Sequence, residues 1–133
     1  MQGVEHIVSK DTELACIIRA DIDPQKTTFV TPSEFEQQLG FIVYPAGGEV
    51  RRHFHRPVER HLTRTTEVVL LRRGRCVLDI YDEEQNLVAS RELKAGDVAL
   101  LVRGGHGYRM LEDTVLLEIK QGPYSGVEER ELF

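Results

Sequence analysis

Short segments in which hydrophobic residues either alternate with polar ones or form brief apolar runs recur along this chain, and they predict short β-strands. Side chains two apart on a strand leave the same face, so a half-buried strand shows an apolar residue at every second position. The pattern is clearest where Cys76, Leu78 and Ile80 share one face. Strands are predicted at 13–19, Phe41–Tyr44, Glu49–His55, Thr65–Leu71, Cys76–Tyr81, Leu87–Leu93, Val98–Val102, Tyr108–Leu111 and Val115–Lys120.

Turn residues separate these strands, and no segment has the periodicity of an amphipathic helix. Gly, Pro, Asp and Asn gather at Asp21–Pro24, Pro45–Gly48, Asp82–Asn86 and Lys94–Asp97. Many short strands without helices predict an all-β sandwich or barrel. We expect a single domain over residues 1–133, with a barrel core at about 35–122, an N-terminal strand at 13–19 and a C-terminal tail at 123–133.

Composition and charge exclude several classes of function. The net charge of −5 argues against non-specific binding to nucleic acid. No apolar run is long enough to span a membrane, and Met1–His6 lacks the features of a secretory signal. We therefore expect a cytoplasmic protein in which Cys16 and Cys76 are buried free thiols.

Positive charge is concentrated in residues 51–75, which contain eight arginines and two acidic residues. One interpretation is a solvated loop of charges. The other is a rim that attracts an anionic substrate, such as a carboxylate or a phosphate. In the predicted strand Glu49–His55, Arg51 shares a face with His53 and His55, so the second interpretation makes Arg51 a substrate-binding residue.

Four side chains are candidates for the ligands of one metal ion. His53 and His55 lie two apart on a predicted strand, and Glu67 lies on the inward face of the next one. His106 lies in a glycine-rich turn, Gly104–Gly107. Three imidazoles and one carboxylate suit a divalent transition metal. Two further histidines, His6 and His61, are expected to have no role in the site.

The spacing of these residues resembles the first motif of the cupin superfamily, G-x5-H-x-H-x(3,4)-E-x6-G. The matching residues are Gly47, His53, His55, Glu67 and Gly74. Eleven residues separate His55 from Glu67, a longer gap than the motif has. Glu59 stands at the family's short spacing and competes for the carboxylate role, but Glu67 is preferred because six residues separate it from Gly74.

The second cupin motif, G-x5-P-x-G-x2-H-x3-N, is matched in part. Gly96 and Gly104 stand in place, and Val102 replaces the proline. His106 comes one residue early, and no asparagine follows at the expected spacing. The resemblance as a whole covers roughly residues 41–121, which is most of the chain.

This resemblance implies a jelly-roll barrel, the double-stranded β-helix of cupins, that holds Fe, Zn, Ni or Mn at His53, His55, Glu67 and His106. Together with the arginine-rich segment 51–75, this ligand set leads us to expect a small anionic substrate. With iron the family's chemistry suggests a dioxygenase, and with the other metals an isomerase or lyase. Tyr108 either lines the mouth of the barrel, where it binds substrate, or fills the core.

Two alternatives stay open at this point. In one group of similar cupins, sugar-nucleotide isomerases and epimerases, the H-x-H pair acts as acid and base without metal. In sensing cupins the barrel holds a small ligand without chemistry. Small cupins also commonly form homodimers through edge strands, and Ala15–Ile18 is the candidate for that contact.

Overall fold

Ten β-strands and no helix make up the computed structural model, which describes residues 1–133. The all-β prediction is confirmed, and no helix is present that is long and apolar enough to cross a membrane. The chain divides into two compact units. We call Met1–Ile22 with Thr65–Phe133 the two-sheet unit, and Asp23–Arg64 the loop unit.

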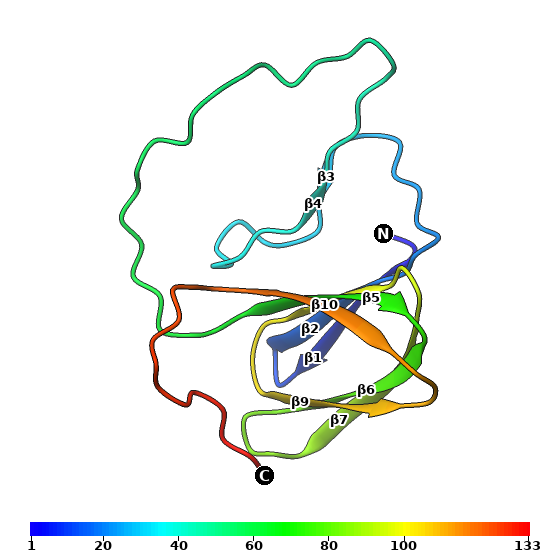
Figure 1. Ribbon diagram of the computed structural model, residues 1–133, viewed down its shortest axis with the longest axis vertical. Coiled ribbons are helices and arrows are strands. Elements are labelled where there is room, and N and C mark those ends of the chain that lie inside the picture. The colour runs from blue at the N-terminus through cyan, green and yellow to red at the C-terminus, as the bar shows by residue number, and fades with distance from the viewer. The chain divides into compact units, whose positions relative to one another are not determined.

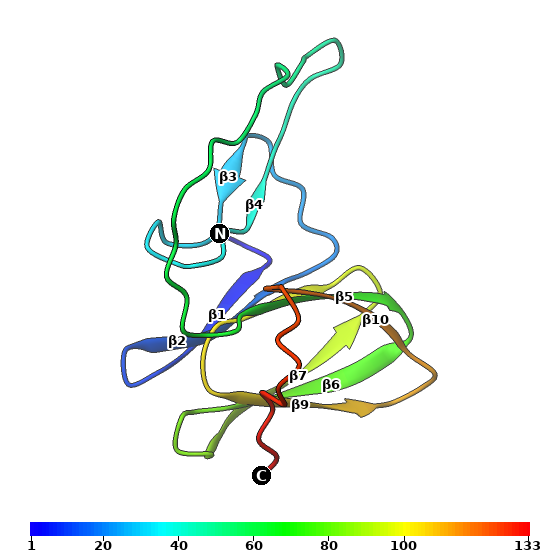
Figure 2. The same cartoon turned by 60° about the vertical axis from the view of Figure 1, so that its left-hand side comes forward.

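Two antiparallel sheets form the two-sheet unit (Figures 1 and 2). The five-stranded sheet has the order β1 (Val4–Ser9), β2 (Thr12–Ile18), β8 (Val98–Leu101), β5 (Glu67–Arg73), β10 (Val115–Lys120). The three-stranded sheet has the order β7 (Leu87–Lys94), β6 (Arg75–Tyr81), β9 (Gly105–Met110). In Figure 1, β5 and β10 lie in one layer and β6, β7 and β9 in the other. Neither sheet closes into a barrel.

The hydrophobic core lies between the two sheets. Cys76, Leu78 and Ile80 of β6 are at most 1% exposed, as their alternation predicted. Burying one Leu or Ile side chain stabilises a fold by about 1.5–3 kcal/mol relative to leaving it in water. From the five-stranded sheet, the same cluster receives Leu14, Ala15, Ile17, Val69, Leu71, Ala99 and Leu101. Cys16 and Cys76 are both buried and free, as expected.

The chain crosses between the sheets at corners that require glycine. Gly74 joins β5 to β6 with φ +97°, and a Cβ at this position would collide with the carbonyl oxygen of Asp113. Gly104 precedes β9 with φ +72°, and its Cβ would collide with the carbonyl oxygen of Tyr81. Only glycine adopts such positive φ angles without strain and leaves room for the neighbouring backbone. These corners put β5 and β9 on facing sheets.

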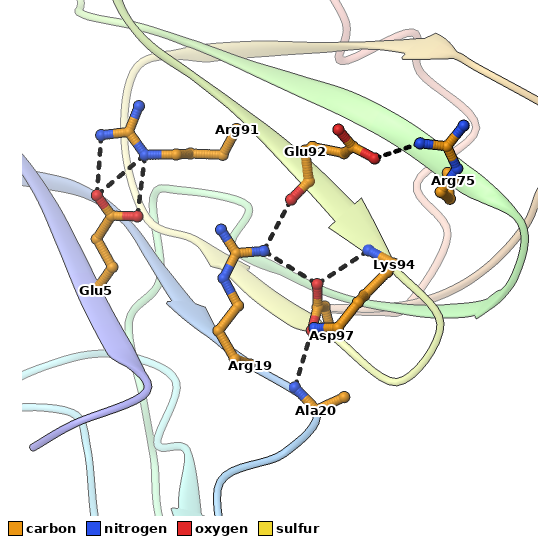
Figure 3. A network of polar contacts seen from close by, with 8 residues as sticks. All are labelled: Glu5, Arg19, Ala20, Arg75, Arg91, Glu92, Lys94 and Asp97. Carbon is orange, nitrogen blue, oxygen red and sulfur yellow. Dashed lines mark hydrogen bonds and ion pairs between the residues drawn. The ribbon is translucent and has the colours of Figure 1, made fainter.

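A buried carboxylate, Asp97, ties the turn between β7 and β8 to the end of β2 (Figure 3). Its Oδ1 accepts hydrogen bonds from the backbone N–H of Ala20, at 2.8 Å, and from Lys94 Nζ, at 3.3 Å. Its Oδ2 accepts from the backbone N–H of Lys94, at 2.9 Å, and from Arg19 Nη1, at 3.0 Å. Burial on its own would raise the pKa of Asp97, but these donors outweigh burial and lower that pKa. The carboxylate is therefore held ionised in the fold.

The loop unit contains one short hairpin, β3 (Thr28–Phe29) with β4 (Gly40–Phe41), and none of its residues is buried. The strand predicted at Phe41–Tyr44 is therefore wrong beyond Phe41. The remainder of this unit, residues 42–64, runs as an open segment without strands (Figure 1).

The strand predicted at Glu49–His55 is wrong, because this segment pairs with no other strand. A strand is stable only where a partner satisfies its backbone N–H and C=O groups. The alternation in this segment includes just two apolar residues, Val50 and Phe54, which are 55% and 99% exposed. Pairing this segment into a sheet would therefore bury little apolar surface and add little stability.

The N-terminal part of the five-stranded sheet differs from the prediction in two ways. Residues 1–12 showed no clear pattern, yet Val4–Ser9 form β1 and pair with β2. Because β2 also pairs with β8 on its other side, Ala15–Ile18 have no free edge and cannot form the predicted edge-strand contact between two copies. The homodimer itself stays a prediction, as does the single domain with its barrel core at 35–122.

Candidate metal centre

Glu67 and His106 come from facing sheets of the two-sheet unit and meet at its partly exposed margin, where their side chains are 17% and 30% exposed. Glu67 begins β5, where Val69 and Leu71 belong to the core, so its inward direction is confirmed. His106 lies on β9 directly opposite Ile80, whose side chain also belongs to the core. The Nε2 atom of His106 lies 3.4 Å from Oε2 of Glu67. This pair is the part of the predicted ligand set that the two sheets bring together.

The prediction that His106 lies in a turn is wrong. The turn is centred on Gly104, and β9 begins at Gly105, three residues before the predicted start at Tyr108. A strand fixes the direction of its side chains by parity, so His106 and Tyr108 both face the interior. Their ring centroids are 5.8 Å apart, edge to face.

Two polar atoms at this place are buried without a hydrogen-bond partner. They are Oε2 of Glu67 and the hydroxyl oxygen of Tyr108. The 3.4 Å between Glu67 Oε2 and His106 Nε2 exceeds the usual donor–acceptor distance of about 2.7–3.2 Å. Since more than about 90% of buried polar groups in proteins are paired, two orphans in one cluster mark an environment suited to a polar ligand or an ion.

Neighbouring charges shift the pKa values of the acidic side chains in this cluster. His106 lowers the pKa of Glu67 and outweighs the opposing effect of burial. Burial, followed by the adjacent Glu67 carboxylate, raises the pKa of Glu118. Glu118 lies on β10 opposite Val69, which puts it on the same face as Glu67. Glu118 is not among the predicted site residues, although a glutamate inside the apolar run Val115–Ile119 is a signal in the sequence.

Tyr108 lies beside the pair as part of the interior. It packs against the core, as one of the two interpretations of this residue predicted. Burial first, and then the charge of Glu67, raises the pKa of the Tyr108 hydroxyl. The phenol therefore stays protonated and offers an O–H donor to any acceptor that reaches the cluster.

His53 and His55 form a second pair, within the loop unit. Both are exposed, and their ring centroids are 5.1 Å apart. Nδ1 of His53 lies 2.7 Å from the carbonyl oxygen of Arg51 and must donate to it, because a carbonyl only accepts. Nε2 of His53 then carries the free lone pair, an arrangement common among metal-binding histidines.

The remaining candidates lie on the exposed part of the loop unit. Arg51 is exposed, and so are Glu59 and His61. The other arginines of this unit are also exposed: Arg52, Arg56, Arg60 and Arg64. Their exposure suits a solvated loop and equally leaves them accessible to an anion.

The predicted ligands thus form two pairs that belong to two compact units, Glu67 with His106 and His53 with His55. That all four share one ion stays a prediction. No protein-family model, no curated protein and no solved structure matches the chain.

Proposed function

We propose that this protein binds a divalent transition-metal ion through Glu67 and His106 and uses the ion on a small anionic molecule. The observation that carries the proposal is the 3.4 Å separation of Glu67 Oε2 from His106 Nε2. Two ligands of one tetrahedral ion, with bonds of about 2.0–2.2 Å, lie about 3.4 Å apart. The separation therefore suits two ligands of one ion better than a hydrogen bond.

The chemistry of the donors agrees with this proposal. A carboxylate oxygen and an imidazole nitrogen are ligands for Zn, Fe, Mn and Ni alike. His53 and His55 are proposed to be metal ligands as well, since the lone pair on His53 Nε2 is free. When bound, such an ion supplies Lewis acidity toward an oxygen of the substrate or toward water.

The surrounding side chains supply binding and proton transfer. The Tyr108 hydroxyl is buried and unpaired, so it donates a hydrogen bond to an anionic oxygen of the substrate. Glu118, whose pKa is raised, keeps a proton to higher pH than an ordinary glutamate and can exchange it with a bound molecule. Arg51 and the other exposed arginines of the loop unit attract the anion.

We further propose that the two-sheet unit is a jelly roll of the cupin type. The chain changes sheets between β5 and β6, β7 and β8, β8 and β9, and β9 and β10. Repeated crossing between two facing antiparallel sheets is how a jelly roll is built. This connectivity, together with the motif residues at Glu67 and His106, supports the family resemblance.

Elemental analysis of protein purified without a metal-affinity column tests the metal proposal. The wild type is expected to carry one equivalent of a transition metal at Glu67 and His106. His106→Ala and Glu67→Gln should each lose about one equivalent relative to the wild type, and His53→Ala should lose part of it. His61→Ala is the matched control, because His61 is exposed and lies outside the proposed set.

Unchanged metal content in His106→Ala and Glu67→Gln would overturn the proposal. A folded wild type that binds none of Fe, Zn, Ni or Mn during dialysis would also overturn it and favour the metal-independent isomerase or epimerase. Metal binding without turnover of any anionic substrate would favour the non-catalytic ligand-binding alternative. Gel filtration separately tests the predicted homodimer.

A further inference from the structure

A second set of metal-ligating side chains lies on the other face of the five-stranded sheet. His6 on β1 and Cys16 on β2 are directly opposite in the register of this antiparallel pair, so their side chains share a face. Ala15 and Ile17 flank Cys16 and point into the core. His6 and Cys16 therefore face away from the core and from Glu67 and His106.

A β-bulge brings a third ligand to this face. In a regular strand, Glu13 would share the face of Ala15 and Ile17 and would therefore point into the core. However, the register pairs Ile7 with Ala15 and then Val8 with Glu13, which leaves Leu14 as an extra residue. The bulge reverses the parity of Glu13, so Glu13 joins the face of His6.

Contacts of the neighbouring residues agree with the bulge. Leu14 and Ala15 are consecutive, yet both belong to the core, which a regular strand does not allow. The carbonyl oxygen of Leu14 accepts hydrogen bonds from the N–H groups of Val102 and Arg103, at 2.8 and 3.2 Å. The extra residue is thus fixed in place by the backbone after β8.

The three side chains converge at one place. Nδ1 of His6 lies 2.5 Å from Oε1 of Glu13. The ligand atoms of His6, Glu13 and Cys16 all lie within 4.8 Å of one another. Ligands of one tetrahedral zinc ion lie about 3.4–3.8 Å apart, given Zn–N and Zn–O bonds of about 2.0–2.2 Å and Zn–S bonds of about 2.3 Å. Small side-chain rotations therefore suffice to bring all three onto one ion.

We propose that His6, Glu13 and Cys16 form a binding site for a thiophilic divalent ion such as Zn²⁺. The thiolate selects for zinc-like metals, and imidazole and carboxylate complete three protein ligands. The side chains of His6 and Glu13 are 43% and 15% exposed, so the ion reaches the site from solvent and a water molecule takes the fourth position. Cys16 is 1% exposed and forms the floor of the site.

Binding requires two proton movements. Burial, and then the Glu13 carboxylate, raises the pKa of Cys16 to about 12, so the metal-free chain carries a thiol. Coordination forms the metal–sulfur bond and releases the thiol proton to solvent. The proton on His6 Nδ1, which now bonds to Glu13, moves through solvent to Nε2, and its place is taken by the metal. No oxidation or reduction occurs.

The ion would also connect the edge strand β1 to β2, since its ligands come from both (Figure 2). A ligand that binds the folded chain only must stabilise it. We therefore expect Zn²⁺ to raise the melting temperature of the metal-free protein, and His6→Gln to reduce that rise without removing the part that the centre at Glu67 and His106 contributes.

Titration of the metal-free full chain with Co²⁺ under a non-thiol reductant tests the proposal directly. Cysteine ligation produces a thiolate-to-cobalt charge-transfer absorption in the near ultraviolet. We expect this band to disappear on addition of Zn²⁺ and to be absent in Cys16→Ala. In His106→Ala, where the other proposed centre is removed, the band should saturate at one equivalent. His6→Gln and Glu13→Gln should each weaken Co²⁺ binding at least tenfold, since losing even an outer-shell partner of a metal ligand typically costs about 10–100-fold in affinity.

Matched controls separate this site from other binding. Cys76→Ala, His61→Gln and Glu84→Gln should keep the band at wild-type affinity, because these residues lie outside the site. The centre at Glu67 and His106 has no sulfur ligand, so His106→Ala should also keep the band. The two proposals can therefore fail independently.

An absent band in the wild type, or a band that survives in Cys16→Ala, would overturn the proposal. The His6–Glu13 contact would then be a simple cross-strand hydrogen bond. If Cys16→Ala does not fold, the two variants at the more exposed ligands decide. If both His6→Gln and Glu13→Gln bind Co²⁺ with wild-type affinity, the proposal is also overturned.

Discussion

The two-sheet unit and the loop unit use apolar residues in opposite ways. In the two-sheet unit, residues such as Leu78 and Ile17 are completely buried between two sheets. The loop unit also contains apolar side chains, including Phe29, Ile42 and Phe54, yet none of its residues is buried. The comparison shows that apolar content alone does not form a core. A core forms where partner strands satisfy the backbone and present facing apolar surfaces.

The same difference separates the two pairs of predicted metal ligands. Glu67 and His106 are fixed by strand parity on two facing sheets, whereas His53 and His55 lie on a segment without a strand partner. Ligands on regular elements are held more precisely than ligands on loops. We therefore expect Glu67 and His106 to be preorganised, and His53 and His55 to gain order when an ion binds.

The largest effect is expected from a cavity in the two-sheet core. Leu78→Ala should lower the free energy of unfolding by about 4 kcal/mol, because it removes a fully buried side chain and leaves a void. Urea denaturation followed by circular dichroism measures this loss. Leu87→Ala is the matched control in the same sheet, since Leu87 is 57% exposed. Equal losses of unfolding free energy in Leu78→Ala and Leu87→Ala would show that Leu78 is not part of a buried core.

A smaller but still large effect is expected at Asp97. Asp97→Asn should cost about 3 kcal/mol, because the amide group faces the N–H donors of Ala20 and Lys94 and no longer neutralises Arg19. The exposed Asp113→Asn serves as the control in the same urea experiment. A cost below about 1 kcal/mol would mean that the buried carboxylate is not needed for stability.

Asp97 also predicts a pH dependence. Its pKa is lower in the folded chain than in the unfolded chain, where it is about 3.9. The carboxylate therefore stabilises the fold fully above that unfolded pKa, and the stabilisation is lost as the pH falls from about 4 through the folded pKa. In urea titrations below pH 5, Asp97→Asn should lose less stability than the wild type does. Parallel acid curves for the two proteins would contradict this.

The smallest effect is expected in the loop unit. Phe54→Ala should change the free energy of unfolding by less than about 0.5 kcal/mol, because the ring is 99% exposed and buries almost no apolar area. The measurement is the same urea transition as for Leu78→Ala. A loss of 2 kcal/mol or more, on the order of a buried aromatic, would show that the loop unit contributes to a core and would remove the contrast between the two units.

Much of the two-sheet unit could be predicted from alternation. The strand boundaries at β6, β7, β8 and β10 agree with the prediction to within one residue. In β6 apolar and polar residues alternate, whereas β8 and β10 contain short apolar runs that follow turn residues. The inward direction of Glu67 also followed from parity. The prediction failed at Glu49–His55, where the alternation of polar residues gave no reason for a partner strand to pair.

The amino-acid sequence by itself determined that this chain forms short β-strands and which face of β5 and β6 is buried, because both depend on neighbours along the chain. Only the tertiary structure decided which ligands meet. Glu67 meets His106 because glycine corners place β5 and β9 on facing sheets, and Glu13 joins His6 and Cys16 because the bulge at Leu14 reverses one parity. Such contacts depend on pairing between distant strands, which a local pattern does not specify.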